Sequence, residues 1–297
     1  MENVAVNAYH PVGPRNRGFF PGGIGTEIGE SRQGGTPPAP ATARASLPRV
    51  LAGKRVFVTG GSGAIGRALC VRFATLGAEV AFSYFSAHEA ADETVRLVKE
   101  AGREPRVLRG DLRDPKAIEA MAAELLSAWD RLDVFVSNAA SGVLRPTTEL
   151  TAKHWDWTVN INARAFLLLT NALAPKIVEG GRVLALSSFG GTKAIPMYAA
   201  IGASKAALES VVRNLAVELG PRGITVNAIA PGIVETQALD YFPNRKELLD
   251  VALKKTSAGR LVRPEDVADV AELLVSEKAR MIHGQTIHVD GGYSILA

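Results

Sequence analysis

From residue 51 to the C-terminus, short apolar runs alternate with longer amphipathic segments. Such alternation is typical of parallel strands joined by helices, because a strand covered on both faces is apolar throughout whereas a covering helix is apolar on one side. The predicted strands are 55–59, 80–84, 105–109, 134–138, 182–187, 225–229 and 286–289, and the predicted helices are 65–76, 89–101, 115–129, 155–173, 204–219 and 264–276. We therefore expect one doubly wound α/β domain, with a seven-stranded parallel sheet and helices on both of its faces.

The first 48 residues have a different character. They are crowded with Gly and Pro, as in 21–23 and 34–38, and show the periodicity of neither a helix nor a strand. The pattern predicts a disordered tail at 1–48 and a folded domain at 49–297. A docking segment anchored by Phe19 and Phe20 is an alternative; so is a transit peptide, although Glu2, Glu27 and Glu30 count against it.

Composition limits the possible functions. No apolar run approaches the roughly 20 residues of a membrane span, and a secretory signal is lacking, so we expect a cytoplasmic protein without a membrane partner. The net charge is +4, of which residues 1–50, with five Arg and three acidic residues, account for +2. The remainder is too small to indicate nucleic acid. The single cysteine, Cys70, excludes a disulfide framework and a cysteine-ligated metal; we expect a buried, unreactive thiol and no metal.

A glycine-rich segment joins the first predicted strand to the first predicted helix. Glycines there allow a tight turn and a close approach of the backbone to a pyrophosphate, while helix N-terminal amides face the anion. Glycine also collects in ordinary turns, but this position predicts a Rossmann-type NAD(P) site. The expected cofactor contacts are Gly60, Ser62, Gly63, Ala64, Ile65 and Gly66.

The end of the second strand bears on the choice of cofactor. Tyr84 and Ser86 are expected to contact the adenosine ribose. No acid is present to bind the ribose hydroxyls of NADH, which favours NADPH. No Arg follows this strand either, and the sequence does not place Arg103, Arg106 or Arg109, so NADH stays possible.

Two further strand ends predict cofactor contacts. Asp111 and Leu112 follow the third strand and are suitably placed to contact the adenine, with a helix N-cap as the alternative role of Asp111. Asn138, Ala139 and Ala140 follow the fourth strand, at the edge of the sheet where ligands of such folds bind. Small residues there leave room for a ribose and would equally suit tight packing.

Taken together, residues 51–297 resemble the short-chain dehydrogenase/reductase superfamily. The resemblance rests on the loop 59–66, on 138–140, Asn162, Lys205, 227–232 and 290–292. It implies a nicotinamide-dependent oxidoreductase in which Lys205 is catalytic. It also implies cofactor contacts at Pro231, Gly232, Ile233 and Thr236 and a homotetramer packed through the helices that carry Asn162 and Lys205.

One position departs from the superfamily pattern. Most members have a catalytic Tyr four residues before the Lys, where this chain has Ile201. Tyr198 is the one Tyr nearby, seven residues before Lys205. That spacing, with the stretches 132–136, 138–146, 154–157, 242–245 and 284–286, resembles FabL-type enoyl-acyl-carrier-protein reductases. The resemblance implies NAD(P)H-dependent reduction of the trans-2 double bond of an enoyl thioester, carried by acyl carrier protein or CoA.

The altered spacing suits this chemistry. Hydride delivered to the β-carbon moves charge onto the carbonyl oxygen further out, so the hydrogen-bond donor must move outward too. We expect Tyr198 to bind that oxygen, either from within a helix, roughly 10 Å along the axis from Lys205, or from just before it. The superfamily resemblance implies that Ser188, at the position of its catalytic serine, orients substrate; capping of its own turn is the alternative. It also implies that Asn162 holds a water behind Lys205, with a polar contact inside its helix as the alternative.

The segment 237–255 is predicted to form a substrate lid. In it, Tyr241 and Phe242 either line an acyl groove or anchor the lid to the core. Nearby basic residues either engage an acidic carrier or CoA phosphates or form a solvated face: Lys246, Lys254, Lys255 and Arg260. Two other functions stay open, a carbonyl or alcohol oxidoreductase that uses Ser188 and a nucleotide-binding protein without catalysis.

Overall fold

The computed structural model describes residues 50–234 and 245–295. Seven parallel strands form one sheet in the order β3-β2-β1-β4-β5-β6-β7. The strands are β1 Arg55–Thr59, β2 Glu79–Tyr84, β3 Arg106–Arg109, β4 Leu132–Ser137, β5 Ile177–Leu186, β6 Thr225–Pro231 and β7 Thr286–Val289. All seven predicted strands are confirmed. Because the chain winds outward in opposite directions from β1 and β4, the loops that follow these two strands diverge, which is where such folds bind ligands.

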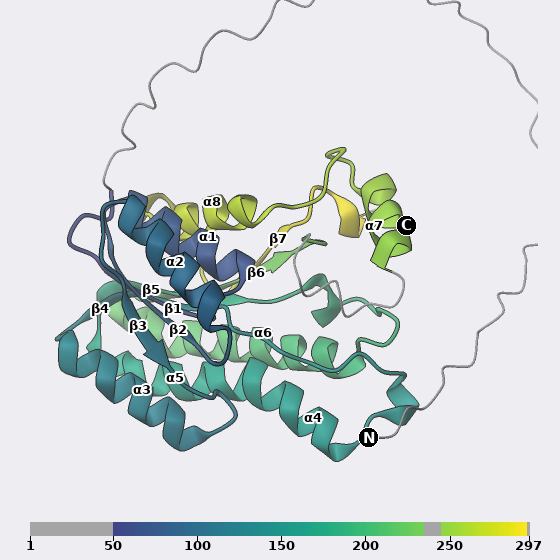
Figure 1. Cartoon of the computed structure of the whole chain (residues 1–297), viewed down its shortest axis with the longest axis horizontal. Coiled ribbons are helices and arrows are strands. Elements are labelled where there is room, and N and C mark those ends of the chain that lie inside the picture. The colour runs from purple at the N-terminus through teal and green to yellow at the C-terminus, as the bar shows by residue number, and fades with distance from the viewer. Residues whose placement is uncertain (1–49, 235–244, 296–297) are drawn as a thin grey trace, which may run out of the picture. The chain divides into compact units, whose positions relative to one another are not determined.

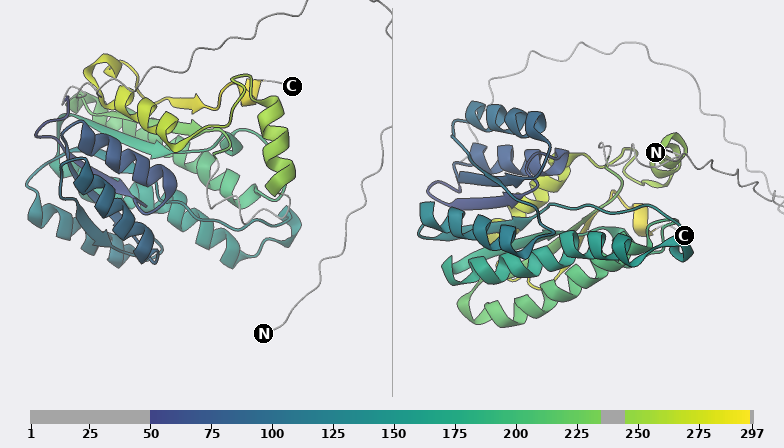
Figure 2. Two further views of the ribbon diagram at one scale, coloured as in Figure 1. Left: turned by 45° about the horizontal axis from the view of Figure 1, so that its top comes forward. Right: turned by 60° about the horizontal axis from the view of Figure 1, so that its bottom comes forward.

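Helices cover both faces of the sheet (Figure 1), and the turned views show the three layers (Figure 2). One face carries α1 Ala64–Thr75, α2 His88–Glu100 and α8 Pro264–Val275; the other carries α3 Pro115–Ala128, α4 Ala152–Val159, α5 Ala165–Leu173 and α6 Ala199–Leu219. The remaining helix, α7 Arg245–Lys255, lies beyond the edge of the sheet. In the described ranges no helix combines the length and the apolarity of a membrane span.

The central strand β1 shows how the two cores arise. Side chains alternate along a strand, so Val56 and Val58 point into the core under α1 and α8. Phe57 points into the opposite core, where its ring stacks on Phe135 at 5.7 Å between centroids. All of these residues are fully buried, which accounts for the unbroken apolar run in the sequence. Cys70 is likewise buried, and burial raises the pKa of its thiol, in agreement with the prediction of an unreactive group.

Two predicted helix boundaries were wrong. The segment 155–173 was predicted as one continuous helix, but a π-helical turn at Asn160–Arg164 separates α4 from α5. A π turn inserts one extra residue into the helical ladder, and hydrophobic spacing alone gives no sign of it. Helix α6 begins at Ala199 rather than at residue 204. Within this added turn Gly202 allows a close approach to the Gly190 carbonyl, since a Cβ there would lie 2.6 Å from its oxygen.

Part of the predicted organisation lies outside the described residues. This applies to the predicted tail at 1–48 and, within the predicted lid, to Tyr241 and Phe242. Thr236, predicted to contact the cofactor, also falls there. The described part of the lid is α7.

Candidate active site

The loop after β1 and the loop after β4 are joined by hydrogen bonds. The Asn138 side chain donates to the carbonyls of Thr59 and Gly60, at 3.0 and 3.1 Å. The Thr59 hydroxyl accepts in turn from the amides of Asn138 and Ala139, both at 3.0 Å. The four bonds hold the carboxyl ends of β1 and β4 together at the point where the connections diverge.

Glycine is required at three positions of this loop, since a Cβ at Gly61 would lie 2.6 Å from the Phe82 side chain. Gly60 has a φ of +68°, and a Cβ there would lie 2.8 Å from the Ala139 Cα. A Cβ at Gly66 would lie 2.2 Å from the Gly60 carbonyl oxygen. Gly63, in contrast, has only an ordinary contact at 3.5 Å, so its backbone is open to a ligand. The glycines therefore bring α1 against the strand and leave one side of the loop accessible.

The N-terminus of α1 suits an anion. Gly63 is its N-cap, and in the described chain no side chain caps the helix and no acid occupies its first turn. The first amides of a helix have no intrahelical acceptor and carry partial positive charge. A nucleotide pyrophosphate fits this turn, and the residues that would hold it are Ser62, Gly63, Ala64 and Ile65.

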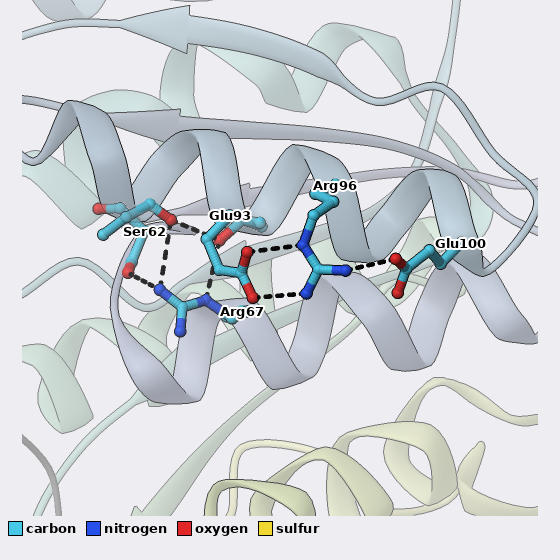
Figure 3. A network of polar contacts seen from close by, with 7 residues as sticks. Ser62, Arg67, Glu93, Arg96 and Glu100 are labelled. Atoms are coloured by element: carbon cyan, nitrogen blue, oxygen red, sulfur yellow. Dashed lines mark hydrogen bonds and ion pairs between the residues drawn. The ribbon is translucent and has the colours of Figure 1, made fainter.

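Side chains of α1 and α2 hold the loop by hydrogen bonds; Figure 3 shows the contact between Arg67 of α1 and Ser62. The Thr94 hydroxyl, which is fully buried, donates to the Gly61 carbonyl at 2.9 Å. The Arg67 guanidinium donates to Thr94 and to the Ser62 carbonyl, at 3.2 and 3.3 Å. The contacts to Gly61 and Ser62 engage carbonyls of the loop. The amides of Gly61 and Gly63 are already bonded within the protein, so the amides left for a ligand are those of Ser62 and of the first residues of α1. Sequence analysis missed Arg67 and Thr94 because neither belongs to the glycine motif.

At the adenosine end the structure excludes one of the two roles expected for Asp111. The N-cap of α3 is Asp114, whose side chain accepts from the Lys116 amide at 2.9 Å, so the N-cap alternative for Asp111 was wrong. Asp111 is instead bound by the Arg113 side chain and backbone, which lowers the pKa of its carboxyl. Nearby, the Tyr84 hydroxyl lies 3.0 Å from the His88 ring, and Ser86 is exposed.

Arg113 links three segments at this end. Its guanidinium lies over the Trp157 ring at 4.3 Å and over the Phe85 ring at 5.4 Å. Trp157 itself donates to the Ser141 hydroxyl at 3.1 Å. Cation–π contacts of this kind orient the guanidinium beside the expected adenine position.

The structure also places the three arginines that the sequence left unassigned. Arg103 donates to the Gly77 carbonyl, before β2 begins, and Arg106 begins β3, so both lie at the amino edge of the sheet. Arg109 ends β3 and pairs in register with Tyr84. Its Nε donates to the Phe85 carbonyl at 3.0 Å, and the side chain is exposed. A cation thus lies beside the end of β2 although none follows it in sequence.

Tyr198 lies immediately before α6, as its N-cap residue. The second of the two positions predicted for it is therefore the correct one. Its hydroxyl donates to the Ser188 hydroxyl at 3.4 Å, and Ser188 also accepts from the Gly190 amide at 3.2 Å. Ser188 thus caps its own turn and contacts the phenol. Burial raises the pKa of Tyr198, which keeps the phenol protonated at neutral pH.

The backbone before Tyr198 is strained. Met197 has a φ of +64°, and it is the one non-glycine residue with positive φ in the described ranges. Such a conformation costs about 1–3 kcal/mol and persists where surrounding contacts impose it. Here the Arg145 amide donates to the Met197 carbonyl at 3.0 Å. The connection after β4 therefore helps to set the direction of Tyr198.

Glycines form the surface against which the Tyr198 ring packs. A Cβ at Gly190 would lie 2.6 Å from Cε1 of the ring, and one at Gly202 would lie 3.8 Å from Cδ1. Ile201, four residues before Lys205, packs elsewhere: a Cβ at Gly142 would lie 2.3 Å from the Ile201 side chain. The position that usually carries the Tyr is thus filled by an alkyl group next to the turn after β4.

Lys205 is buried and points to the end of β5. Its ammonium donates to the Leu186 carbonyl at 2.7 Å, and only 5% of the residue is exposed. Burial lowers the pKa of Lys205 to about 8, while the negative charge of Glu209 acts in the opposite direction. At pH 7 the ammonium is still mostly charged.

Asn162 lies in the π turn and makes two contacts. Its side chain accepts from the Ser141 amide at 2.9 Å and donates to the Ser204 hydroxyl at 2.8 Å. It therefore connects the turn after β4 to the helix that carries Lys205. π turns are frequent at functional sites, where they redirect a side chain.

The remaining predicted residues lie along the same sheet edge. Pro231 ends β6, and the Gly232 amide donates to the Val289 carbonyl at 2.9 Å. A Cβ at Gly232 would lie 2.9 Å from the Asp290 Cα, so this glycine allows a close backbone crossing. Within the ranges 50–234 and 245–295, no three His, Cys, Asp or Glu side chains gather as a metal site.

Fold and site together define a nucleotide-binding α/β oxidoreductase. A family model described as enoyl-(acyl carrier protein) reductase matches residues 60–294. The chain belongs to this branch of the short-chain dehydrogenase/reductase superfamily.

Individual relatives agree with this assignment. A 1-cyclohexenylcarbonyl-CoA reductase of Streptomyces collinus is 36% identical over 243 residues, covering 81% of this chain and 87% of the relative. A hydroxynaphthalene reductase-like protein of Metarhizium majus is 34% identical, over 82% of this chain and 96% of the relative. The crystal structure of a Burkholderia cenocepacia short-chain dehydrogenase in complex with NADP has a TM-score of 0.77 and 34% identity, covering 82% and 99% of the two chains.

The link between α2 and the glycine loop can be tested with Thr94→Val, which keeps the shape but removes the bonds of the hydroxyl to Gly61 and Arg67. Loss of the buried bond to Gly61, about 1 kcal/mol, should by itself raise the Kd for NADPH roughly fivefold. Fluorescence titration with NADPH measures it. Thr75→Val is the matched control, because the Thr75 hydroxyl bonds Val71 inside α1, away from the loop. Equal affinity of the two variants would contradict a role of Thr94 in cofactor binding.

Proposed function

We propose that the protein uses NADPH to reduce the trans-2 double bond of an enoyl thioester. The observation that carries the proposal is the position of Tyr198, just before α6 and seven residues before the buried Lys205. Its phenol is paired with Ser188, and Ile201 takes the place nearer the Lys. The donor is thus displaced along the substrate, as reduction of a conjugated double bond requires.

The proposed chemistry divides among three residues. NADPH, when bound, supplies the hydride, and negative charge then develops on the thioester carbonyl oxygen. Tyr198 donates a hydrogen bond to that oxygen, which its raised pKa supports because the phenol stays protonated. The charged Lys205 holds the nicotinamide ribose and lends positive charge. The α-carbon takes its proton from Tyr198 or from solvent. Asn162 fixes the turn after β4 to α6, and Ser188 accepts a hydrogen bond from the Tyr198 phenol.

A relative supports the thioester substrate. The Streptomyces collinus protein is named as a reductase of an unsaturated acyl-CoA, and the family model carries the acyl-carrier-protein reductase description. Lys246, Lys254 and Lys255 are exposed on α7, where they suit the phosphates of CoA or an acidic carrier. Arg260, in contrast, is held by the Asp266 carboxylate at 2.6 Å, so its charge is already paired.

Arg109 supports NADPH over NADH. Its Nε is bonded to the Phe85 carbonyl, beside the end of β2 where the adenosine ribose of such folds lies. With Nε engaged, the two terminal amino groups of the guanidinium are the ones available to a phosphate. We propose that they bind the 2′-phosphate, with Ser86 as a second donor.

A second candidate function is reduction of a carbonyl group. The Tyr198–Ser188 pair could bind a ketone oxygen, and the Metarhizium majus relative is named for a hydroxynaphthalene reductase. The displaced Tyr favours the enoyl substrate. A nucleotide-binding protein without catalysis is the third candidate.

The deciding experiment follows absorbance at about 340 nm with NADPH and crotonyl-CoA or a longer trans-2-enoyl thioester, beside the matched 3-ketoacyl thioester. We expect oxidation with the enoyl substrate and little with the keto substrate. Oxidation with the keto substrate alone would reverse the assignment in favour of the carbonyl reductase. NADPH binding without turnover of either thioester would favour the non-catalytic candidate.

Tyr198→Phe should lower kcat by about 10²-fold, since removing one oxyanion donor has an effect of that order, and should leave the Kd for NADPH nearly unchanged. Steady-state kinetics with the enoyl thioester measures the first, and fluorescence titration the second. Tyr293→Phe is the control, because the Tyr293 ring packs on Phe189 and the substitution keeps that ring. An unchanged kcat in Tyr198→Phe would contradict the role of Tyr198 as the donor to the thioester carbonyl oxygen.

Arg109→Gln should raise the KM for NADPH by roughly 10-fold or more, because a charge-assisted hydrogen bond contributes about 1.5–3 kcal/mol, while the KM for NADH stays the same. Arg106→Gln is the matched control: it removes the same charge from the same strand, at the opposite edge of the sheet. If both variants raise the KM for NADPH equally, the effect comes from the loss of net charge, and Arg109 makes no specific contact with the cofactor.

A further inference from the structure

A carboxylate is buried behind Lys205. Glu209 lies one helical turn further along α6 and is only 6% exposed. The Ser187 hydroxyl donates to its Oε1 at 2.5 Å. Leu186, which accepts from Lys205, and Ser187 are consecutive residues at the end of β5. One strand end therefore holds both an ammonium and a carboxylate of the same helix.

The turn after β5 closes over this carboxylate. Residues Phe189–Gly191 form a short 3-10 helix, and a Cβ at Gly191 would lie 3.1 Å from Glu209 Oε1. A larger residue would have to displace the carboxylate. An ionised acid enclosed in this way is costly unless its charge and hydrogen bonds are matched. Ser187 supplies one bond, and the nearby charge of opposite sign is Lys205.

We propose that Glu209 is a positioning residue that keeps Lys205 protonated and directed along the end of β5 for its part in the proposed reduction. The proposal rests on the proposed role of Lys205 at the nicotinamide ribose. Glu209 itself touches neither substrate nor cofactor; it acts through the lysine. Sequence analysis passed over it because an acid four residues after a Lys on a helix is commonly an ordinary surface pair.

The electrostatics give the direction of the effect. Burial lowers the pKa of Lys205 to about 8, and the attraction of Glu209 opposes this. The hydrogen-bond partner of the ammonium in the described ranges is the Leu186 carbonyl on β5, which is uncharged. Glu209 makes no hydrogen bond to Lys205, so its charge acts on the ammonium through space. Without its charge, desolvation acts alone and Lys205 loses its proton at lower pH.

Glu209→Gln separates this role from a purely structural one. Glutamine keeps the length and a carbonyl oxygen that can accept from Ser187, but it removes the charge. If Glu209 only fastens α6 to β5 through Ser187, the substitution leaves the pH dependence of NADPH binding and turnover unchanged. If it supports the charge on Lys205, the alkaline limit of Lys205-dependent binding moves to lower pH.

The test measures the Kd for NADPH by fluorescence, and the turnover of crotonyl-CoA, between pH 6 and about pH 9.5. In Glu209→Gln we expect the alkaline loss of binding and of turnover to begin about one pH unit lower than in the wild type. Glu218→Gln is the matched control, an exposed acid on the same helix, and should behave as wild type. Circular dichroism verifies the fold of each variant; should Glu209→Gln not fold, Glu209→Met, apolar and of similar length, replaces it.

The outcomes separate the two proposals. An unchanged alkaline midpoint in a folded Glu209 variant overturns the role of Glu209, whatever the substrate. An equal shift in Glu218→Gln overturns it too, because the effect would then be one of net charge. If the wild type turns over no enoyl thioester, the proposed function fails. The pH dependence of the Kd for NADPH then still measures the effect of Glu209 on Lys205.

Discussion

The site depends on one constraint, the divergence of the chain at the carboxyl ends of β1 and β4. Parallel strands bring successive loops to the same edge, and the Asn138 side chain then ties the two central loops together through the Thr59 and Gly60 carbonyls. The remaining positions follow from it. Gly60 and Gly66 allow α1 to approach, Thr94 and Arg67 bind carbonyls of the loop, and the amides at the start of α1 are left for an anion.

The reactive end is organised on the same edge through α6. Its N-cap residue carries the phenol, and its buried face carries Lys205 and Glu209, so one rigid helix sets the spacing among three groups. The strained backbone at Met197 and the packing of the Tyr198 ring against Gly190 fix the orientation of the phenol. Because these contacts come from the loops after β4 and β5, the geometry of the donor depends on the whole sheet edge. Ile201 fills the place nearer to Lys205, and Tyr198 is the phenol that the proposed reduction uses as its donor.

Electrostatics distinguish the two titratable groups of the site. Burial raises the pKa of the Tyr198 phenol and lowers that of the Lys205 ammonium, so both approach the neutral form as far as their surroundings allow. For the phenol this favours hydrogen-bond donation. For the lysine it works against the charge that the proposed reduction uses, and the buried Glu209 opposes that tendency.

The sequence by itself determined the seven strands, the order of loop and helix around the glycine motif, and the residues of the sheet edge. These depend on local periodicity and on glycine sterics, both of which are determined by residues close together in the sequence. Only the tertiary structure decided that Asp114 rather than Asp111 caps α3, that a π turn places Asn162, and that Tyr198 precedes α6. It alone brought Arg109 to the end of β2, Thr94 to Gly61 and Glu209 to Ser187. The three contacts join residues that are distant in the chain, and the other three features depend on the residue at which a helix begins or changes its hydrogen-bonding pattern. Neither kind of information is contained in the pattern of adjacent residues.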